Sequence, residues 1–216
     1  MKLAIFGATG KSGQALVGQA LRAGHELTAL ARTPEKLEAR AGLTTIQGDA
    51  RDPDACARTI SGSDAVISLL GNFNRKANTE VSDATRAIVE AMRASGCQRI
   101  VVVTTIGVGD SFVPLRSFVF KAVIRFVAKE IWRDRERQEA AVRDSRLEWT
   151  IVRPGGLTDG DATGRWTLIE GGAPQPKKVS IARADLAAVL LDIVVDATLA
   201  LQTRCIFNPS TSGATK

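Results

Sequence analysis

Tyrosine is absent from this sequence of 216 residues, and histidine occurs only once, at His25. Tyrosine and histidine are common proton donors and acceptors in enzymes that work near neutral pH. His25 follows a predicted helix and precedes a predicted strand, so we expect it in a turn far from any binding cleft. General acid–base catalysis by either side chain is therefore excluded.

Cysteine is also scarce. The three cysteines are Cys56, Cys97 and Cys205. Their spacing does not match a metal-binding pattern, and their odd number argues against a framework of disulfides. We expect three buried thiols, as in proteins of reducing compartments. No metal ligands are predicted.

A long hydrophobic run is missing as well. The most apolar stretch, residues 186–201, contains Asp192 and Asp196 and is too short to span a bilayer. Met1 stands at the start of the first predicted strand, so we expect no signal peptide. These features predict a cytoplasmic protein without a membrane span.

The bulk composition is that of an ordinary globular chain, with 44% hydrophobic and 24% charged residues. The length suits a single domain over residues 1–216. We expect a small substrate-side region formed by loops 106–117 and 154–180. The net charge of +6 points to an anionic partner, for which phosphates, nucleic acid and an acidic membrane are candidates.

The most informative stretch is Gly7-Ala8-Thr9-Gly10-Lys11-Ser12-Gly13. It follows an apolar run typical of a buried strand and precedes a helical pattern at 14–23, the context in which such glycines form a dinucleotide site. Gly7 allows the chain to turn, Gly10 lets the backbone approach a pyrophosphate, and Gly13 lets the helix pack closely on the sheet. A flexible turn is the alternative interpretation.

Strands and helices alternate along the rest of the chain, which predicts an α/β, doubly wound parallel sheet of the Rossmann type. The expected strand order is 3-2-1-4-5-6 plus an edge strand at 204–207. A short helix is predicted at 34–41, and the stretch around Trp166 is predicted to be irregular. Asp52 followed by Pro53 is typical of a helix start.

The end of the second predicted strand favours one cofactor over another. NAD-binding domains carry an acidic residue about 20 residues after the glycines, but Ala31 and Arg32 stand in this region. A guanidinium can bind a 2′-phosphate, and Lys11 adds charge in the glycine turn. The pattern predicts NADP(H); a solvated Arg32 is the alternative.

Other candidates stand at the carboxyl ends of the predicted strands, where ligands of open α/β sheets bind. Asp49 could face the adenine ring. Leu70 and Gly71 end the fourth strand, Thr104 ends the fifth, and Pro154 follows the sixth.

The glycine motif, Arg32, Gly48-Asp49 and Trp149-Thr150-Ile151-Val152-Arg153-Pro154-Gly155 together resemble the atypical short-chain dehydrogenase/reductase group. The closer similarity is to NAD(P)H-binding proteins like biliverdin-IXβ reductase/flavin reductase and to NmrA-like proteins. The resemblance covers nearly the whole chain and implies an NADP(H) cofactor. The predicted cofactor-binding residues are Gly7, Thr9, Gly10, Lys11, Ser12, Gly13, Arg32, Asp49, Ala50, Leu70, Gly71, Thr104 and Pro154.

Members of this group that reduce ketones use a Tyr-x-x-x-Lys pair, which a chain without tyrosine cannot supply. Trp132 lies in the corresponding region, but its indole N–H does not ionise usefully. Hydride transfer to a flavin or quinone fits, because water can supply the proton. The alternative is a non-catalytic NADP(H) sensor of the NmrA-like type; a sugar-nucleotide epimerase or dehydratase is disfavoured.

Three polar residues stand in predicted loops near the carboxyl ends of the strands. Ser111 is a weak catalytic candidate that could donate a hydrogen bond to a substrate, and a purely structural loop serine is the alternative. Asp110 and Asp159 are expected to be solvated and without partners.

Residues 116–146 carry nine lysines and arginines and five acidic residues, which accounts for most of the net charge. A solvent-facing helix with an apolar underside is the first interpretation. Steering of an anionic substrate is the second, and a membrane or nucleic-acid patch is the third, with nucleic acid disfavoured. One helix or two, and a monomer or a homodimer, remain open.

Overall fold

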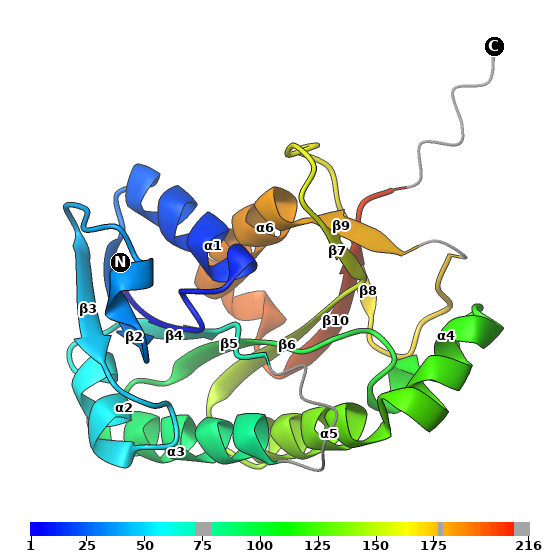
Figure 1. The fold of residues 1–216 in the computed structure, drawn as a ribbon, viewed down its shortest axis with the longest axis horizontal. Coiled ribbons are helices and arrows are strands. Elements are labelled where there is room, and N and C mark those ends of the chain that lie inside the picture. The colour runs from blue at the N-terminus through cyan, green and yellow to red at the C-terminus, as the bar shows by residue number, and fades with distance from the viewer. Residues whose placement is uncertain (72–78, 177–178, 210–216) are drawn as a thin grey trace.

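The computed structural model describes residues 1–71, 79–176 and 179–209. Its centre is an eight-stranded sheet in the order β3-β2-β1-β4-β5-β6-β10-β8 (Figure 1). The strands are β1 (Lys2–Phe6), β2 (Glu26–Ala31), β3 (Leu43–Gln47), β4 (Ala65–Ser68), β5 (Arg99–Val103), β6 (Glu148–Pro154), β8 (Thr167–Glu170) and β10 (Gln202–Phe207). The predicted order 3-2-1-4-5-6 and the parallel α/β class are confirmed.

Helices cover both faces of this sheet (Figure 1). The helices α1 (Lys11–Arg22) and α6 (Arg183–Val195) pack together on one face, and α2 (Pro53–Ile60), α3 (Glu80–Ser95) and α5 (Lys129–Arg143) lie on the other. Strand β1 shows why both layers form. Leu3 and Ile5 belong to the core under α1, whereas Ala4 and Phe6 belong to the core over α3. A strand whose residues are apolar on both faces can be buried only between two layers.

The start of α2 follows the predicted chemistry. The side chain of Asp52 accepts a hydrogen bond from the backbone N–H of Asp54 at 3.0 Å, and Pro53 is the first residue of α2. Gly96 ends α3 in the left-handed conformation, with φ of 78°. His25 lies in the turn between α1 and β2, as expected.

Three local predictions were wrong. Residues 34–41 form only a 3-10 turn at Pro34–Lys36, because Leu37 is the one large apolar side chain available there to pack on the core. The strand predicted at 204–207 is not at the edge, since β10 pairs with β6 on one side and with β8 on the other. The stretch after Trp166 is not irregular but forms the antiparallel edge strand β8.

A second, two-stranded sheet was not anticipated. It pairs β7 (Gly156–Thr158) with β9 (Ser180–Ala182). It follows directly on β6, so it stands at the carboxyl edge of the main sheet.

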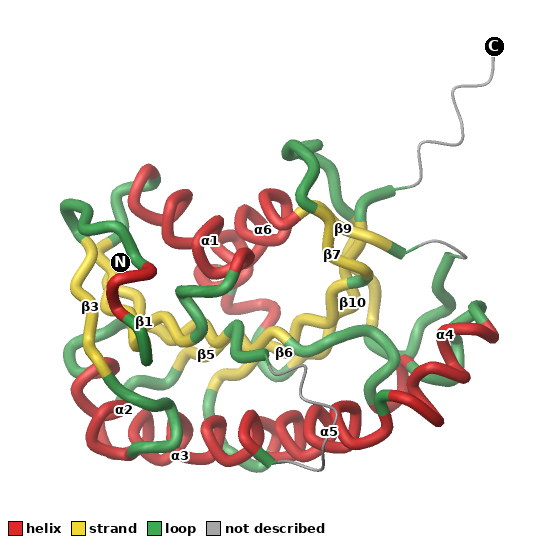
Figure 2. Tube along the Cα trace, in the orientation of Figure 1, coloured by secondary structure: helices red, strands yellow, loops and turns green. Residues whose placement is uncertain are grey.

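The basic segment 116–146 is not a single helix. The helix α4 (Phe118–Ala122) runs into a π-helical turn at Val123–Val127, and α5 begins after Ala128. Figure 2 shows α4 projecting beyond α5 at the end of the molecule remote from α2. Among the residues that the structure describes, no helix has both the length and the apolar character needed to cross a membrane.

Candidate cofactor-binding site

A cleft of about 590 Å³ lies at the carboxyl ends of the parallel strands. All of the predicted cofactor-binding residues line it, namely Gly7, Thr9, Gly10, Lys11, Ser12, Gly13, Arg32, Asp49, Ala50, Leu70, Gly71, Thr104 and Pro154. They come from six separate segments of the chain. Ligands of open α/β sheets bind at this edge, where the direction of strand connection reverses.

The turn from β1 to α1 is built so that only glycine fits at two positions. Gly7 has φ of 87°, and a Cβ there would lie 2.7 Å from the carbonyl oxygen of Leu69. A Cβ on Gly13 would lie 2.2 Å from the carbonyl oxygen of Gly7. A Cβ on Gly10 would lie 3.5 Å from its nearest neighbouring atom, which is an ordinary contact. Packing within the protein therefore does not require glycine at this position, and the bare backbone leaves space for a ligand. The roles predicted for Gly7 and Gly13 in turning and packing the chain are confirmed.

The first turn of α1 faces the cleft without a side-chain cap. Gly10 is the residue before the helix, no side chain accepts a hydrogen bond from this end, and no acidic residue stands in the first turn. Lys11, Ser12 and Gly13 line the cleft. Their N–H groups and the helix dipole together favour an anion such as a pyrophosphate.

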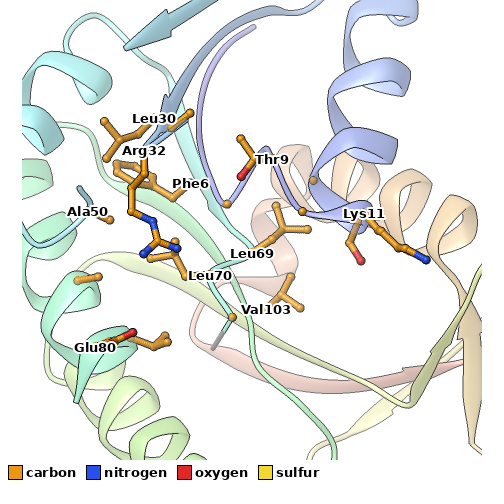
Figure 3. Close-up of a pocket in the computed structure, with 18 of the residues that line it drawn as sticks. Phe6, Thr9, Lys11, Leu30, Arg32, Ala50, Leu69, Leu70, Glu80 and Val103 are labelled. Atoms are coloured by element: carbon orange, nitrogen blue, oxygen red, sulfur yellow. The ribbon is translucent and has the colours of Figure 1, made fainter. Parts of the chain in front are cut away.

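Positive charge surrounds the end of the cleft formed by β2 and β3. The Arg32 side chain reaches toward Leu70, on the opposite side of the glycine turn from Lys11 (Figure 3). Arg51 donates hydrogen bonds from Nε and Nη2 to the two oxygens of Asp49, at 2.9 and 2.8 Å. These side-chain hydrogen bonds lower the pKa of Asp49 to about 2. The carboxylate of Asp49 therefore stays ionised. Because Arg51 already pairs with it, Asp49 does not cancel the positive charge of the exposed Arg32 nearby.

A family model described as NAD(P)H-binding matches residues 7–197. The chain belongs to this NAD(P)H-binding family. The matched range begins at Gly7 and ends after α6, so it includes every segment of the cleft described above.

Two of the proteins similar to this chain are named as reductases. A (4-alkanoyl-5-oxo-2,5-dihydrofuran-3-yl)methyl phosphate reductase of Streptomyces griseus is 31% identical over 151 residues, which are 69% of this chain and 46% of that protein. The chain thus spans about half the length of that curated relative. The structure of ChuY, an anaerobilin reductase of Escherichia coli O157:H7, superposes with a TM-score of 0.79 at 28% identity over 99% of this chain and 100% of that one.

A third comparison concerns the fold alone. A short-chain dehydrogenase/reductase of Veillonella parvula in complex with NADP superposes with a TM-score of 0.81 at 19% identity, over 97% of this chain and 95% of that one. The family model and the similarity to ChuY, with the shared fold, confirm the resemblance to atypical short-chain dehydrogenases/reductases.

The expectation that Asp159 is free in solvent was wrong. Its carboxylate accepts hydrogen bonds from Lys11 Nζ at 2.8 Å and from Arg183 Nη1 at 2.5 Å. These two cations belong to α1 and α6, and the hydrogen bond from Lys11 lowers the pKa of Asp159. The pairing joins the loop at Asp159 to the first residues of α1 and α6.

The expectation for Asp110 was also wrong, because it pairs with the fully buried Arg153. Arg153 donates from Nε and Nη2 to Glu139 at 2.9 and 2.6 Å, and Thr104 donates its hydroxyl to the same carboxylate at 2.8 Å. This buried network fixes the end of β5 next to the cleft.

Ser111 is a structural residue. It has no exposed surface, accepts a hydrogen bond from the Gly107 N–H at 2.9 Å and donates one to the Val108 carbonyl at 2.7 Å. Ser111 is not among the described residues that line the cleft, and its hydroxyl already takes part in two hydrogen bonds within the loop.

Several lining residues were not predicted from the sequence: Arg51, Glu80, Val81, Ala84, Arg135, Leu157, Arg183 and Leu186. Arg135 is the most informative of them. It lies on α5 with 8% of its surface exposed and donates from Nη1 to the Leu70 carbonyl at 2.8 Å and to Gln138 Oε1 at 2.9 Å. Trp132, which stands in the region where related ketone reductases carry the Tyr-Lys pair, is not among the described residues that line the cleft. This helix carries several arginines, and nothing in the sequence distinguishes Arg135 from the others.

Within the described residues, no group of histidine, cysteine and acidic side chains is placed to hold a metal ion. The three cysteines are free and buried, and burial raises the pKa of Cys56 to about 12 and of Cys205 to about 11.

Proposed function

We propose that this chain is an NADP(H)-dependent reductase that passes hydride to a planar, electron-poor acceptor of the flavin or quinone class. One observation carries the proposal: the glycine turn and Arg32 line one cleft, and Arg32 stands where an NAD-binding domain would carry a carboxylate. A reduced nicotinamide supplies two electrons and one hydrogen to the acceptor, and a proton from water completes the reduction.

The residues of the cleft fit a phosphate-rich cofactor. Lys11, Arg32, Arg51, Arg135 and Arg183 contribute positive charge, and the acidic lining residues are Asp49 and Glu80. Asp49 is neutralised by Arg51. The remaining positive charge and the uncapped helix end favour three phosphates over two, which is the difference between NADP(H) and NAD(H).

The acceptor would bind at the opposite end of the cleft from Arg32. Leu157 and Pro154 line that end from the loop region 154–180, and Thr104 lines it at the end of β5. We propose that the regions 106–117 and 154–180 form the acceptor side. The protein there would hold two rings against each other, so that catalysis depends on orientation.

Among the described residues that line the cleft there is no histidine, cysteine or tyrosine. This supports an acceptor that takes its proton from water. It also supports a second candidate function, a non-catalytic NADP(H) sensor, because such a protein needs the cofactor cleft and no chemistry.

The test is oxidation of NADPH by the purified chain, followed by nicotinamide absorbance, with flavin mononucleotide and with a simple quinone. NADH is offered in parallel. Arg32→Asp is compared with Arg22→Asp, which makes the same charge change on an exposed residue of α1 outside the cleft. We expect turnover that prefers NADPH, is lost in Arg32→Asp and is kept in Arg22→Asp.

Two outcomes oppose the proposal. Tight NADPH binding without turnover on either acceptor would favour the sensor. Equal turnover with NADH and NADPH would remove the assignment of Arg32 to the 2′-phosphate.

A further inference from the structure

We propose that the segment 112–129, which includes α4, docks on an anionic lipid bilayer. This inference goes beyond the reductase proposal, because none of the described residues in 112–129 lines the cofactor cleft. The segment overlaps the basic region 116–146 at 116–129 and the proposed acceptor side at 112–117.

Exposed apolar side chains are concentrated in this segment. Val113, Phe118, Val119 and Phe126 are exposed by 78%, 86%, 77% and 80%, and Val123 by 39%. The other large apolar residues that are exposed in the described chain, Met1, Leu157, Val195 and Leu201, are scattered over the molecule. Single exposed apolar residues need no explanation, whereas a cluster marks an interaction surface.

The inner side of the same segment is buried against the rest of the protein. Leu115, Ile124 and Ala128 are buried, and Leu115 and Ile124 pack in a small core with Ile106 and Cys205. Phe118 in α4 and Phe126 in the π-helical turn that follows are both exposed to solvent. The exposed apolar side is therefore a second face, separate from the one that anchors the segment.

The charges in the segment have one sign. Residues 112–129 contain four basic residues, Arg116, Lys121, Arg125 and Lys129, and no aspartate or glutamate. Within the described part of the chain, no ion pair joins Arg116, Lys121 or Lys129 to a carboxylate. Helical segments that bind the surface of anionic bilayers combine basic residues with exposed phenylalanine, leucine or tryptophan in this way.

Two other occupants fit the surface less well. A symmetric pair of copies would bring this basic, acid-free segment against itself, where like charges repel. Single-stranded nucleic acid would use stacking on aromatic rings. The exposed side of this segment includes Val113, Val119 and Val123, which offer no ring for stacking. Acyl chains accept aliphatic and aromatic side chains alike.

The segment packs on the loop that follows Thr104, a residue of the cleft lining. A Cβ on Gly107 would lie 2.8 Å from Ile124 Cδ1 and 3.1 Å from Leu115 Cδ1, so both side chains contact this loop. Docking through α4 would thus hold the β5 end of the cleft near the bilayer, where apolar acceptors dissolve.

The experiment is sedimentation of the full chain with vesicles of phosphatidylcholine alone and with phosphatidylglycerol added, at low and at high ionic strength. The test variant is Phe118→Ser/Phe126→Ser. The matched control is Val195→Ser/Leu201→Ser, which removes apolar side chains that are exposed by 60% and 63% elsewhere. All four test and control side chains are largely exposed, so the variants should fold, and thermal unfolding checks this.

We expect binding that requires phosphatidylglycerol, weakens with salt, falls by about tenfold in the test variant and is unchanged in the control. Arg116→Gln/Lys129→Gln should lower binding and its salt dependence. The proposal is overturned if the chain does not sediment with phosphatidylglycerol vesicles at low salt, or if the test variant binds them as the parent does. If the parent dimerises, does not bind vesicles, and loses dimerisation in the test variant, the surface belongs to a second copy. If the parent binds a single-stranded oligonucleotide more strongly than vesicles, the surface belongs to nucleic acid. Either result overturns the proposal.

Discussion

Arg153 at the end of β6 and Glu139 on α5 form an ion pair in which neither side chain has more than 1% of its surface exposed. Nε and Nη2 of the arginine each donate to one carboxylate oxygen of the glutamate. Burial lowers the pKa of Arg153, but the hydrogen bonds to Glu139 and Asp110 outweigh burial and raise it overall. Arg153 therefore remains charged inside the protein, behind the strand ends that line the cleft.

Removing one member of this pair should be costly. We expect Glu139→Ala to lower the free energy of unfolding by about 3–5 kcal/mol, because Arg153 would be left buried without its main partner. The double variant Glu139→Leu/Arg153→Met should lose less than Glu139→Ala, since it leaves no charge. Urea unfolding measures both. The control is Arg143→Gln, which removes the half-exposed partner of Glu139 and should cost less than about 1 kcal/mol.

The two glycines of the turn should respond differently to alanine. Gly13→Ala places a Cβ 2.2 Å from the Gly7 carbonyl oxygen, so it should shift α1 and lower the free energy of unfolding by about 2 kcal/mol or more. Gly10→Ala meets the protein at an ordinary 3.5 Å and should keep its stability. Its methyl group would instead occupy space along the cleft and weaken NADPH binding by about tenfold. Thermal unfolding and fluorescence titration separate the two effects; equal stability losses would contradict this division.

The sequence predicts those features that depend on residues close together in the chain. The glycine turn, the Asp52 cap and the order of the parallel strands follow from residues within one strand–helix unit, and the cleft residues follow because they stand at strand ends. The ion pairs could not be predicted in this way. Lys11 and Asp159 are 148 residues apart, and Asp110 and Arg153 are 43 apart, so only the folded chain brings each pair together.

Strand β8 and residue Arg135 were missed for related reasons. β8 has four half-buried or exposed residues and is held by pairing with β10, not by a strong apolar pattern of its own. Arg135 stands in a helix rich in arginine, and only packing against Leu70 distinguishes it.

The carboxylate of Asp185 should make stability depend on pH. It is fully buried at the start of α6 and accepts hydrogen bonds from Thr163 N–H, Gly164 N–H and Asn208 Nδ2 at 2.9, 3.0 and 2.7 Å. Burial raises the pKa of Asp185, but hydrogen bonds from Thr163, Asn208 and Gly164 lower it below its ordinary value overall. The charged form is thus the one that stabilises the fold.

Because the native pKa is lowered, this stabilisation is present above the unfolded pKa of about 3.9 and is lost as the pH falls through the native value. We expect Asp185→Asn to lower the free energy of unfolding by about 2 kcal/mol at neutral pH. The difference from the parent should shrink below about pH 4. Asp192→Asn, on the exposed side of the same helix, is the control and should change little. A difference that stayed constant from neutral to acid pH would contradict the argument; urea unfolding at several pH values measures it.

Variants of Arg135 can separate the effect of its positive charge from the effect of its hydrogen-bond geometry. Burial lowers its pKa, and its Nη1 donates to both Leu70 and Gln138. Arg135→Met should weaken NADPH binding by about tenfold through the lost charge in the cleft and lower the free energy of unfolding by about 1–3 kcal/mol through the unpaired Leu70 carbonyl. Arg135→Lys keeps the charge but not the planar fork, so it should recover most of the affinity and only part of the stability. Fluorescence titration and urea unfolding of the two variants measure this. If Lys restored stability but not affinity, Arg135 would act on the cofactor through directed hydrogen bonds and not through its charge.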